Sequence, residues 1–547
     1  MKRRSLLFPL SQQPHSTCKS QRGHTDYVSP EFAMRTEAGL EPWSPSGNDV
    51  WDFAKAAHLL RRCMVGPTPS EIRQAVQDGL ETTLNKLFTS FEPSVSDIQE
   101  IAGQEPQIRP ASSDTATVQA WQTLVNKHKD MLRRWRAKTI ALSPVSLQEK
   151  LITFWSNHFT SELQVVNFAQ YMYTQELLIR TYMLGNFHDF TYQVTIDPAM
   201  LIYLDGRKNF VIGKRNQINE NYARELMELF TCGVYDWDGK PNYSEDDVAQ
   251  AARGLSGWDI KPSDKGALYS SLSSQFNALR WDGGDKTLMG KTGKWKANDI
   301  VDIVFSERTN SIAKYICVKL YREFVYDIPD KTIVEQMAQT FIDSKWNIRT
   351  VIEQLLRSKH FFALENIGAK HKSPVEFFIG AVRGLGLKNI VDFDFSRVGR
   401  QTQLLLGIID SQGQTLFDPP NVKGWEGGRT WTSTSTLPQR QKWIMDIMDG
   451  KIRSGAGAQQ QTVFVFDAIA FAKQFSTPND LKKLSQEMAE FLLNVPPSDA
   501  EFTVLFDTIL DGGKDYEWNI DDVAQRPDAR IRKFIKAAAE FAKFQLT

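Results

Sequence analysis

The chain has 547 residues, with 65 Lys and Arg balanced by 65 Asp and Glu. This length is enough to bury a large core. A formal net charge of zero provides no field that would draw the chain to nucleic acid or to an acidic membrane. We find no uninterrupted apolar run long enough to span a bilayer. The sequence therefore predicts no nucleic-acid partner and no transmembrane segment.

The spacing of cysteines and histidines excludes the common metal motifs. Cys18, Cys63, Cys232 and Cys317 are far apart and form no CxxC pair, and the eight histidines form no HExxH motif. This argues against a zinc knuckle, a dithiol redox motif and a zinc-protease site. Disulfides stay open, because their pairing cannot be inferred from spacing.

Residues 1–48 are rich in Ser, Pro, Gln and charge and are expected to form a disordered tail. The tail starts with MKRRSLLFPL, in which a twin arginine precedes a short apolar patch. This resembles a twin-arginine export signal only faintly, because the patch breaks at Pro9 and no small-residue cleavage site follows. A basic tail and a signal remnant are both open interpretations.

Helical periodicity begins at Trp51 and recurs to the end of the chain. Residues 49–547 are therefore predicted to form one large, mainly α domain, a multi-helix bundle with long irregular loops. Ser70 and Ser373 are expected to cap helices. A turn-rich excursion over 260–298 leaves room for one small β-hairpin, and 451–461 is expected to be a flexible insert.

The stretch from 219 to 258 predicts a helical hairpin. On a helix over 219–230, the residues Tyr222, Ala223, Leu226, Met227, Leu229 and Phe230 fall on one arc, and Glu220, Asn221, Arg224, Glu225 and Glu228 fall on the other. Gly233 is expected to stop this helix, and Ser244 to open a second one through a capping box with Asp247. The second helix ends at Gly257–Trp258.

The polar face of the first helix is a candidate site. Crowded carboxylates repel one another unless a cation or raised pKa values relieve them. Glu220, Glu225 and Glu228 are the candidate acid–base or metal groups, and Asn219 and Arg224 could orient a substrate. The alternative is a structural network in which Arg224 pairs with Glu220 or Glu228 at helical spacing.

The loop before this helix contains further side chains with oxygen atoms that could contribute to the candidate site. Asp205 and Asn209 lead into the helix and could help to hold a divalent cation. Asp197, followed by Pro198, has the default role of a helix N-cap. The spacing does not match a calcium-binding EF-hand loop, so any metal stays unidentified.

Other candidates lie beside aromatic residues. Asn157 and His158 follow the aromatic helix of LITFWSNHF, where they could form a site wall or a hydrogen-bonded core pair. Trp425 and Trp431 lie in a Gly-rich loop over 412–440, where they could stack on a sugar or another flat ligand, or lock the loop onto the body. Trp258 is a further candidate for binding a partner.

The ordered spacing of these segments resembles a bacterial family of proteins of unknown function, DUF1800. The resemblance covers the chain from about residue 51 to its end and rests on AAHLLRR with GPTPSEI, FWSNHF, DPAMLIYLDG, NENYARELMELF, YSEDDVAQAARGLSGW, KYICVKLYREFV, KSPVEFF, GQTLFDPPNVKGW and FQL. Two positions depart from the family pattern. The family usually has a second histidine at Ser156 and His-Asp at Trp281–Asp282. Any metal or relay role of those histidines would be lost here.

The resemblance implies a mainly helical bacterial protein, often exported by a twin-arginine route, in the periplasm or at the cell surface. A cytoplasmic location is the alternative. It also implies a partner of the DUF1501 family, which is similar to sulfatases and alkaline phosphatases, because the two families often have neighbouring genes.

Two functions are open. The first is an accessory protein of the cell envelope that binds a partner protein or a polysaccharide, which the Trp-rich loop, the neutral charge and the lack of a complete catalytic motif favour. The second is an extracytoplasmic hydrolase, with or without a metal ion, that uses Glu220, Glu225 and Glu228 with assistance from His158. A carboxylate face lining an open pocket would favour the enzyme, and a face sealed by cations would favour a structural role.

Overall fold

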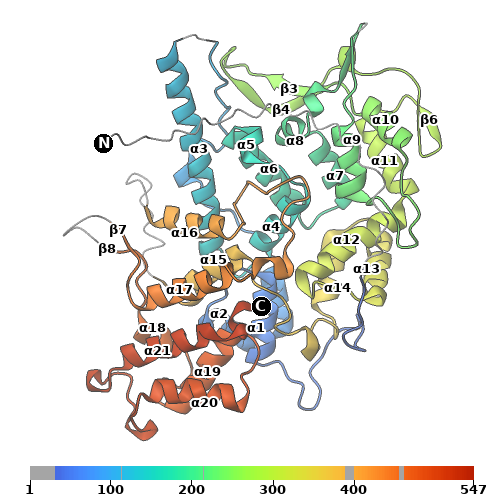
Figure 1. Cartoon of the computed structure of the whole chain (residues 1–547). Coiled ribbons are helices and arrows are strands. Elements are labelled where there is room, and N and C mark those ends of the chain that lie inside the picture. The colour runs from blue at the N-terminus through green and yellow to red at the C-terminus, as the bar shows by residue number, and fades with distance from the viewer. Residues whose placement is uncertain (1–30, 112–113, 214, 388–399, 455–460) are drawn as a thin grey trace, which may run out of the picture.

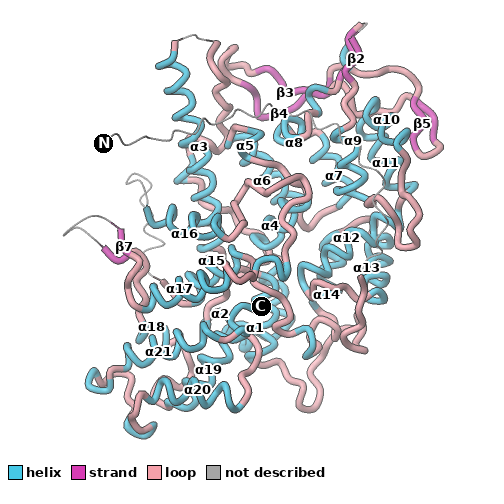
Figure 2. The backbone as a smooth tube through the Cα atoms, in the orientation of Figure 1, coloured by secondary structure: helices cyan, strands magenta, loops and turns pink. Residues whose placement is uncertain are grey.

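The computed structural model describes residues 31–111, 114–213, 215–387, 400–454 and 461–547 (Figure 1). Within these ranges the protein is mainly helical, as the sequence predicts, with helices α1–α21 and four two-stranded antiparallel sheets. Figure 2 shows the strands at the margins of the molecule and the helices through its body. No helix in the described ranges combines the length and the apolar character needed to cross a membrane.

The first ten helices run from the N-terminal segment to the predicted hairpin. Their bounds are α1 Phe53–Cys63, α2 Pro69–Leu87, α3 Thr115–Leu142, α4 Gln148–His158, α5 Leu163–Val166, α6 Ala169–Tyr182, α7 Phe187–Thr195, α8 Pro198–Tyr203, α9 Asn221–Glu225 and α10 Glu245–Gly254.

The remaining helices complete the body. Their bounds are α11 Ala297–Glu307, α12 Thr309–Phe324, α13 Lys331–Asp343, α14 Ile348–Leu356, α15 Pro374–Gly384, α16 Arg400–Ser411, α17 Thr436–Met448, α18 Ala468–Ala472, α19 Leu481–Leu493, α20 Asp499–Leu510 and α21 Pro527–Glu540. Figure 1 shows α1 beside the C-terminal helices, where Arg61 Nη2 donates to the backbone oxygen of Phe491 at 2.6 Å.

Capping boxes open several of these helices. Ser244 and Ser373 cap α10 and α15 as the sequence predicts, each with a reciprocal acid three residues later. The predicted cap of α2 at Ser70 is wrong, because Thr68 is the cap. Pro69 occupies the first helical position, where its missing N–H costs nothing, so the cap lies one residue before it.

Two buried apolar clusters hold the helices together. The larger draws side chains from Leu40 to Phe544, and the smaller lies around Trp135 and Tyr171, among α3, α5, α6 and α8. Cys63, Cys232 and Cys317 are free and buried. The apolar side chains predicted to share one face of the helix over 219–230 are largely buried. The amphipathic pattern therefore predicts correctly which face of this helix packs against the core.

The expected N-terminal tail is ordered in its second part. Residues 1–30, including the twin arginine, lie outside the described residues. Over 31–48, Leu40 and Trp43 are buried, which moves the start of packed structure ahead of the predicted boundary at 48. The indole of Trp43 donates to Asp49 Oδ2 at 2.6 Å and its ring packs against Phe362. These contacts explain why a polar composition does not leave this segment disordered.

Strand pairs occupy the irregular regions. Where one hairpin was expected over 260–298, two pairs are present: β3 Trp258–Pro262 with β4 Ser270–Phe276, and β5 Lys286–Leu288 with β6 Lys291–Gly293. A further pair, β1 Phe210–Ile212 with β2 Arg215–Gln217, precedes α9. In the expected insert 451–461, β7 Arg453–Ser454 pairs with β8 Gln461–Thr462, and residues 455–460 lie outside the described residues.

Candidate functional site

The helix predicted over 219–230 is present but changes its winding. It begins as α9 and continues as a π-helical turn, η3 Leu226–Thr231. Asn219 Oδ1 accepts from the backbone N–H of Asn221 at 2.9 Å, at the helix start. Gly233 follows with φ of +74° and ends the helix as predicted. π-helical turns are rare and are frequently found at functional sites, so η3 is the first candidate position for such a site.

Arg224 connects the two helices of the hairpin. Its guanidinium donates to both carboxylate oxygens of Glu245 on α10, at 2.9 and 2.7 Å. The predicted pairing with Glu220 is present at 3.6 Å. The hydrogen bonds to Glu245 raise the pKa of Arg224. The stronger partner thus comes from the second helix, and Glu220 itself is exposed.

The carbonyl groups of η3 are bound by side chains from other helices. The Leu229 oxygen accepts from Tyr315 Oη and from Lys319 Nζ, both at 3.2 Å. The Phe230 oxygen lies 3.0 Å from His158 Nε2. The wider π turn displaces these oxygens from the regular i→i−4 ladder, and tertiary donors satisfy them.

His158 is a buried, hydrogen-bonded histidine. Because Nε2 must donate to the Phe230 oxygen, Nδ1 carries the lone pair, which accepts from Lys319 Nζ at 3.0 Å. Burial, followed by the Lys319 charge, holds the pKa of His158 well below its usual value. A neutral imidazole is therefore the form that this site stabilises.

Lys319 is a functional candidate that sequence reasoning missed. Burial, and then the charge of Arg322, lower the pKa of Lys319 to about 7. Its Nζ lies 4.6 Å from the centre of the Tyr315 ring. A half-buried lysine of this kind exchanges its proton near neutral pH, as a general base requires. Its place in the amphipathic pattern of α12 gave no signal of this.

The glutamates lie on the outer side of η3. Tyr243 Oη donates to Glu228 Oε2 at 3.3 Å, and burial together with the Glu228 charge raises the pKa of Tyr243. Burial also raises the pKa of Tyr315, and the charges of Glu228 and Glu225 add to this. Tyr315 therefore packs against Lys319 and lies within the electrostatic influence of both carboxylates. We call this group the η3 centre: His158, Glu225, Glu228, Tyr243, Tyr315 and Lys319.

Acidic side chains also surround Tyr203 at the end of α8. Burial, and then the charges of Glu162, Glu225 and Asp418, raise the pKa of Tyr203 to about 12. Burial raises the pKa of Glu162 and of Asp418 as well. Among the residues the structure describes, no group of three His, Cys, Asp or Glu side chains is arranged to hold a metal ion. Glu225, a member of the η3 centre, thus also acts on Tyr203, together with Glu162 and Asp418.

Asn209 organises the start of the hairpin. Its side chain is 3 % exposed, donates to the Ala252 oxygen at 2.8 Å and accepts from the Asn219 N–H at 3.1 Å. Asp205 pairs instead with exposed Lys208 at 2.6 Å. The amide of Asn209 is thus committed to backbone groups, and the carboxylate of Asp205 to a surface ion pair.

The predicted tryptophans are anchored to the body. Trp425 and Trp431 are 9 % and 8 % exposed. The side-chain amide of Asn157 makes two hydrogen bonds to the backbone of Trp425. Its Oδ1 accepts from the Trp425 N–H at 2.7 Å, and its Nδ2 donates to the Trp425 oxygen at 3.2 Å. Gly424 has φ of +81°, and a Cβ there would lie 2.1 Å from Asn157 Oδ1. Trp258, at the start of β3, packs its half-buried ring against Phe276.

A small pocket lies beneath this loop. We call it the loop pocket; its volume is about 30 Å³ and its lining is Arg136, Thr153, Ser156, Ser161, Met172, Gln175, Glu176, Ile179, Leu416, Phe417, Pro419 and Trp425. Ser156 is part of this wall. Phe417 has φ of +63°, a backbone strain that often marks functional loops. Trp431 is not part of the lining.

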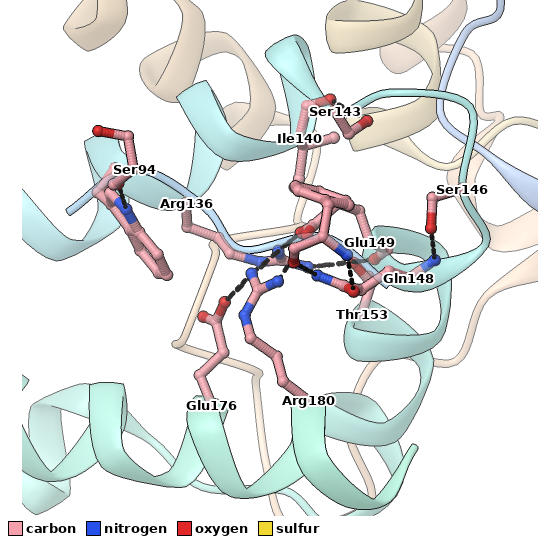
Figure 3. Close-up of polar contacts among 12 residues, drawn as sticks. Ser94, Arg136, Ile140, Ser143, Ser146, Gln148, Glu149, Thr153, Glu176 and Arg180 are labelled. Atoms are coloured by element: carbon pink, nitrogen blue, oxygen red, sulfur yellow. Dashed lines mark hydrogen bonds and ion pairs between the residues drawn. The ribbon is translucent and has the colours of Figure 1, made fainter. Parts of the chain in front are cut away.

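Buried charges form one end of the loop pocket (Figure 3). Arg136 binds Glu149, and Arg180 donates to Glu149 Oε1 at 2.8 Å and to Glu176 Oε1 at 2.6 Å. All four side chains are at most 8 % exposed, and their formal charges cancel. Glu176 Oε2 has no hydrogen-bond partner among the described residues. A buried oxygen of this kind is costly unless something else binds it.

A second buried carboxyl lies next to this end. Gln175 Nε2 donates at 3.0 Å to Ser161 Oγ and, also at 3.0 Å, to Asp197 Oδ2. Asp197 caps α8 as predicted, by accepting from the Met200 N–H. Burial raises the pKa of Asp197 to about 7. The capping motif was visible in the sequence, and the burial that changes its protonation was not.

Comparison with known proteins gives the family. A family model described as protein of unknown function (DUF1800) matches residues 58–539. The chain belongs to the DUF1800 family. No curated protein and no solved structure matches the chain. The match spans both the η3 centre and the loop pocket, so the resemblance of the separate motifs extends over the whole region that holds the candidate sites.

In this DUF1800 protein the predicted site residues fall into separate places. His158 contacts η3 and Lys319, the charges of Glu228 and Glu225 act on the neighbouring Tyr315, and Trp425 lines the loop pocket. Asn219, Glu220 and Arg224 lie at the exposed start of α9, and Asp205, Asn209, Trp258 and Trp431 belong to neither place. The groups that the sequence did not indicate are Lys319, Tyr315, Gln175 and Glu176.

Proposed function

We propose that this DUF1800 protein is an accessory protein of the cell envelope that binds a polysaccharide at the loop pocket. The observation that carries the proposal is Glu176, which lines the pocket and keeps one buried carboxylate oxygen without a partner among the described residues. A hydroxyl donor from a ligand would complete its hydrogen bonding. Sugars present such donors.

The rest of the lining suits one arm of a sugar. The pocket combines the guanidinium of Arg136, the amide of Gln175 and several hydroxyls with the rings of Phe417 and Trp425. Small-ligand sites commonly pair an apolar wall with a few fixed polar groups. A volume of about 30 Å³ accepts roughly two water-sized groups. The pocket would therefore hold the exocyclic hydroxymethyl group of a sugar, and the sugar ring would lie at the entrance of the pocket.

Two tryptophans of one loop provide a matched test. Trp425 lines the pocket and Trp431 does not, although both are buried to the same degree. In calorimetric titrations with neutral envelope oligosaccharides, Trp425→Leu should weaken binding at least tenfold, and Trp431→Leu should leave it unchanged. Equal losses in the two variants, or no binding by the wild-type protein, would contradict the proposal.

Location and partner belong to the same proposal. MKRRSLLF and the family resemblance support export to the periplasm or the cell surface, and a sulfatase-like DUF1501 protein is the proposed partner. Residues 1–48 fused to a reporter that is active only after folded export should direct export. Changing Arg3 and Arg4 together to Lys should reduce it. A signal that the double change leaves unaffected would contradict the twin-arginine route, and no signal from the unchanged fusion would favour the cytoplasmic alternative.

A hydrolase is the second candidate, because Lys319 contacts His158 directly at the η3 centre. As a free amine, Lys319 would take a proton from the attacking water while the water oxygen forms the new bond and the bond to the leaving group breaks. The Tyr243 hydroxyl, oriented by Glu228, would give its proton to the leaving group and regain one from Lys319 through solvent. Hydrolysis should then rise with pH through about 7 and disappear in Lys319→Met. If Lys319→Met hydrolyses polysaccharide substrates at the wild-type rate, this assignment is refuted.

Metal dependence is tested separately. Elemental analysis of the purified protein, beside the variant with both Glu220 and Glu225 changed to Gln, should find one equivalent of metal only in the wild type if the carboxylate face holds a cation. The absence of metal from both correctly folded proteins would remove the metal-dependent form of the hydrolase proposal.

A further inference from the structure

A cavity outside the η3 centre and the loop pocket lies where the end of α1 meets the C-terminal segment of the chain. It is bounded by the segment after α1, by α15, by α19 and by the C-terminal turn η10 Ala542–Gln545, and its volume is about 70 Å³. We call it the Arg61 cavity. Most of its wall is apolar: Met64, Pro67, Phe377, Ala381, Leu385, Phe491, Leu492 and Phe544.

Glycines let the walls of the cavity approach closely. Gly66 has φ of +63°, and a Cβ at this position would lie 2.2 Å from the Cα of Gly380 on α15. Gly384, one turn further along α15, faces the ring of Phe491, which a Cβ would reach at 3.2 Å. The backbone therefore forms part of the wall, and the cavity is a built feature of the packing between these elements.

Two cations lie at one end of the cavity. Arg61 is 9 % exposed and donates to the backbone oxygens of Glu490 and Phe491, at 3.2 and 2.6 Å. Lys372 Nζ donates to the Phe544 oxygen at 2.8 Å and lies 5.0 Å from the centre of its ring. Within the described ranges, the recorded partners of both groups are backbone oxygens and aromatic rings, and neither has a carboxylate within ion-pair distance.

The carboxylate that lines the cavity is already engaged. Glu376 binds Lys150 and accepts from the Ser373 N–H at 2.7 Å. The charges of Lys150 and Lys370 overcome its burial and hold its pKa at about 2. Glu376 is thus ion-paired with Lys150. Its charge acts on Lys372, and that of Glu490 acts on Arg61, only from beyond ion-pair distance, so neither cation of the cavity has a direct counter-ion among the described residues.

We infer that the Arg61 cavity is a binding site for a short-chain aliphatic carboxylate. A buried cation without a counter-charge is costly, and an anion held between Arg61 and Lys372 would supply it. The apolar wall would take the hydrocarbon tail. At roughly 10–15 Å³ for each water-sized group, the cavity has room for about five to seven heavy atoms, a range that includes butyrate with its four carbons and two oxygens.

Protonation gives this inference its own signature. Burial, followed by the charge of Arg61, lowers the pKa of Lys372 to about 7. A bound carboxylate would stabilise the charged form and raise this pKa. Binding at pH 8 should therefore take up close to one proton, measured as a dependence of the calorimetric enthalpy on the ionisation heat of the buffer.

The test uses the full-length protein and three ligands of similar shape. Butyrate should bind, butyramide should bind at least tenfold more weakly, and butylamine should not bind. Equal affinity for butyrate and butyramide, or no binding of butyrate, would overturn the inference without any mutation.

Variants then locate the site. Lys372→Met keeps the side-chain length and should weaken butyrate binding at least tenfold and abolish the proton uptake. Ala381→Leu fills the cavity without changing charge and should also prevent binding. Lys543→Met removes a lysine outside the lining and is the matched control. Butyrate binding that survives both Lys372→Met and Ala381→Leu, in proteins with unchanged circular dichroism, would place the ligand elsewhere.

Discussion

Asp197 should make this protein less stable as the pH rises. Its carboxyl is 2 % exposed, and burial raises its pKa from 3.8 to about 7. A group with a raised folded-state pKa contributes its full stability below its unfolded pKa and loses that contribution as the pH rises through the folded pKa. The shift of about 3 units corresponds to roughly 4 kcal/mol over the whole window, of which roughly 2–3 kcal/mol falls between pH 5 and pH 8.

Asp197→Asn removes this pH dependence with little change of shape. Oδ2 accepts both recorded bonds, from the Met200 N–H and from Gln175 Nε2, and Oδ1 has no partner in the described ranges. The amide nitrogen of Asn can therefore take the place of Oδ1, and Asn is an equally good cap. The stability of the variant relative to wild type should rise by roughly 2–3 kcal/mol from pH 5 to pH 8.

Urea unfolding followed by tryptophan fluorescence measures this difference at each pH. The matched control is Asp480→Asn, which changes the exposed N-cap of α19. Its hydrogen bond from the Lys483 N–H lowers the pKa of Asp480. The contribution of this group is complete above the unfolded pKa of 3.8 and is lost only at lower pH, so the stability of Asp480→Asn relative to wild type should stay constant from pH 5 to pH 8. A relative stability of Asp197→Asn that is the same at both pH values would refute the reasoning.

Three further changes test other parts of the site. Gly424→Ala should destabilise the protein by more than ~2 kcal/mol, because the added Cβ collides with Asn157 and the backbone there is left-handed. Gly413→Ala meets no such collision and should cost only ~1 kcal/mol of backbone strain. Equal urea midpoints for the two variants would contradict this prediction. The lowered pKa of Lys319 predicts that wild type loses stability relative to Lys319→Met as the pH falls from 10 to 6, and a constant difference would argue against it. Arg224→Ala should cost less than ~1 kcal/mol in thermal unfolding, as exposed ion pairs do, and a larger loss would make that pair a main tie of the hairpin.

The parts of the fold that sequence reasoning predicted depend on near neighbours. The caps at Asp197, Ser244 and Ser373 and the stop at Gly233 need only residues within one or two turns. The mainly helical class follows from repeated amphipathic periodicity. The misplaced cap at Ser70 shows the limit of this reasoning, which is about one turn in position.

The parts that the sequence did not show depend on distant partners. The π turn binds Tyr315 and Lys319, which are 86 and 90 residues from Leu229 along the chain. Periodicity at 100° per residue describes the helix before the turn and carries no sign of donors from α12. The loop pocket depends likewise on Asn157, which binds Trp425 across 268 residues. Such pairings are fixed by tertiary packing, and local pattern does not encode them.

The last turn of α4 joins the two candidate sites. Consecutive residues on a helix point about 100° apart, so Ser156, Asn157 and His158 face three different elements. Ser156 lines the loop pocket, Asn157 holds the loop above it, and His158 bonds η3 and Lys319. A ligand that moves Trp425 would act on the same turn that positions His158. One turn of α4 therefore contributes side chains to both candidate sites.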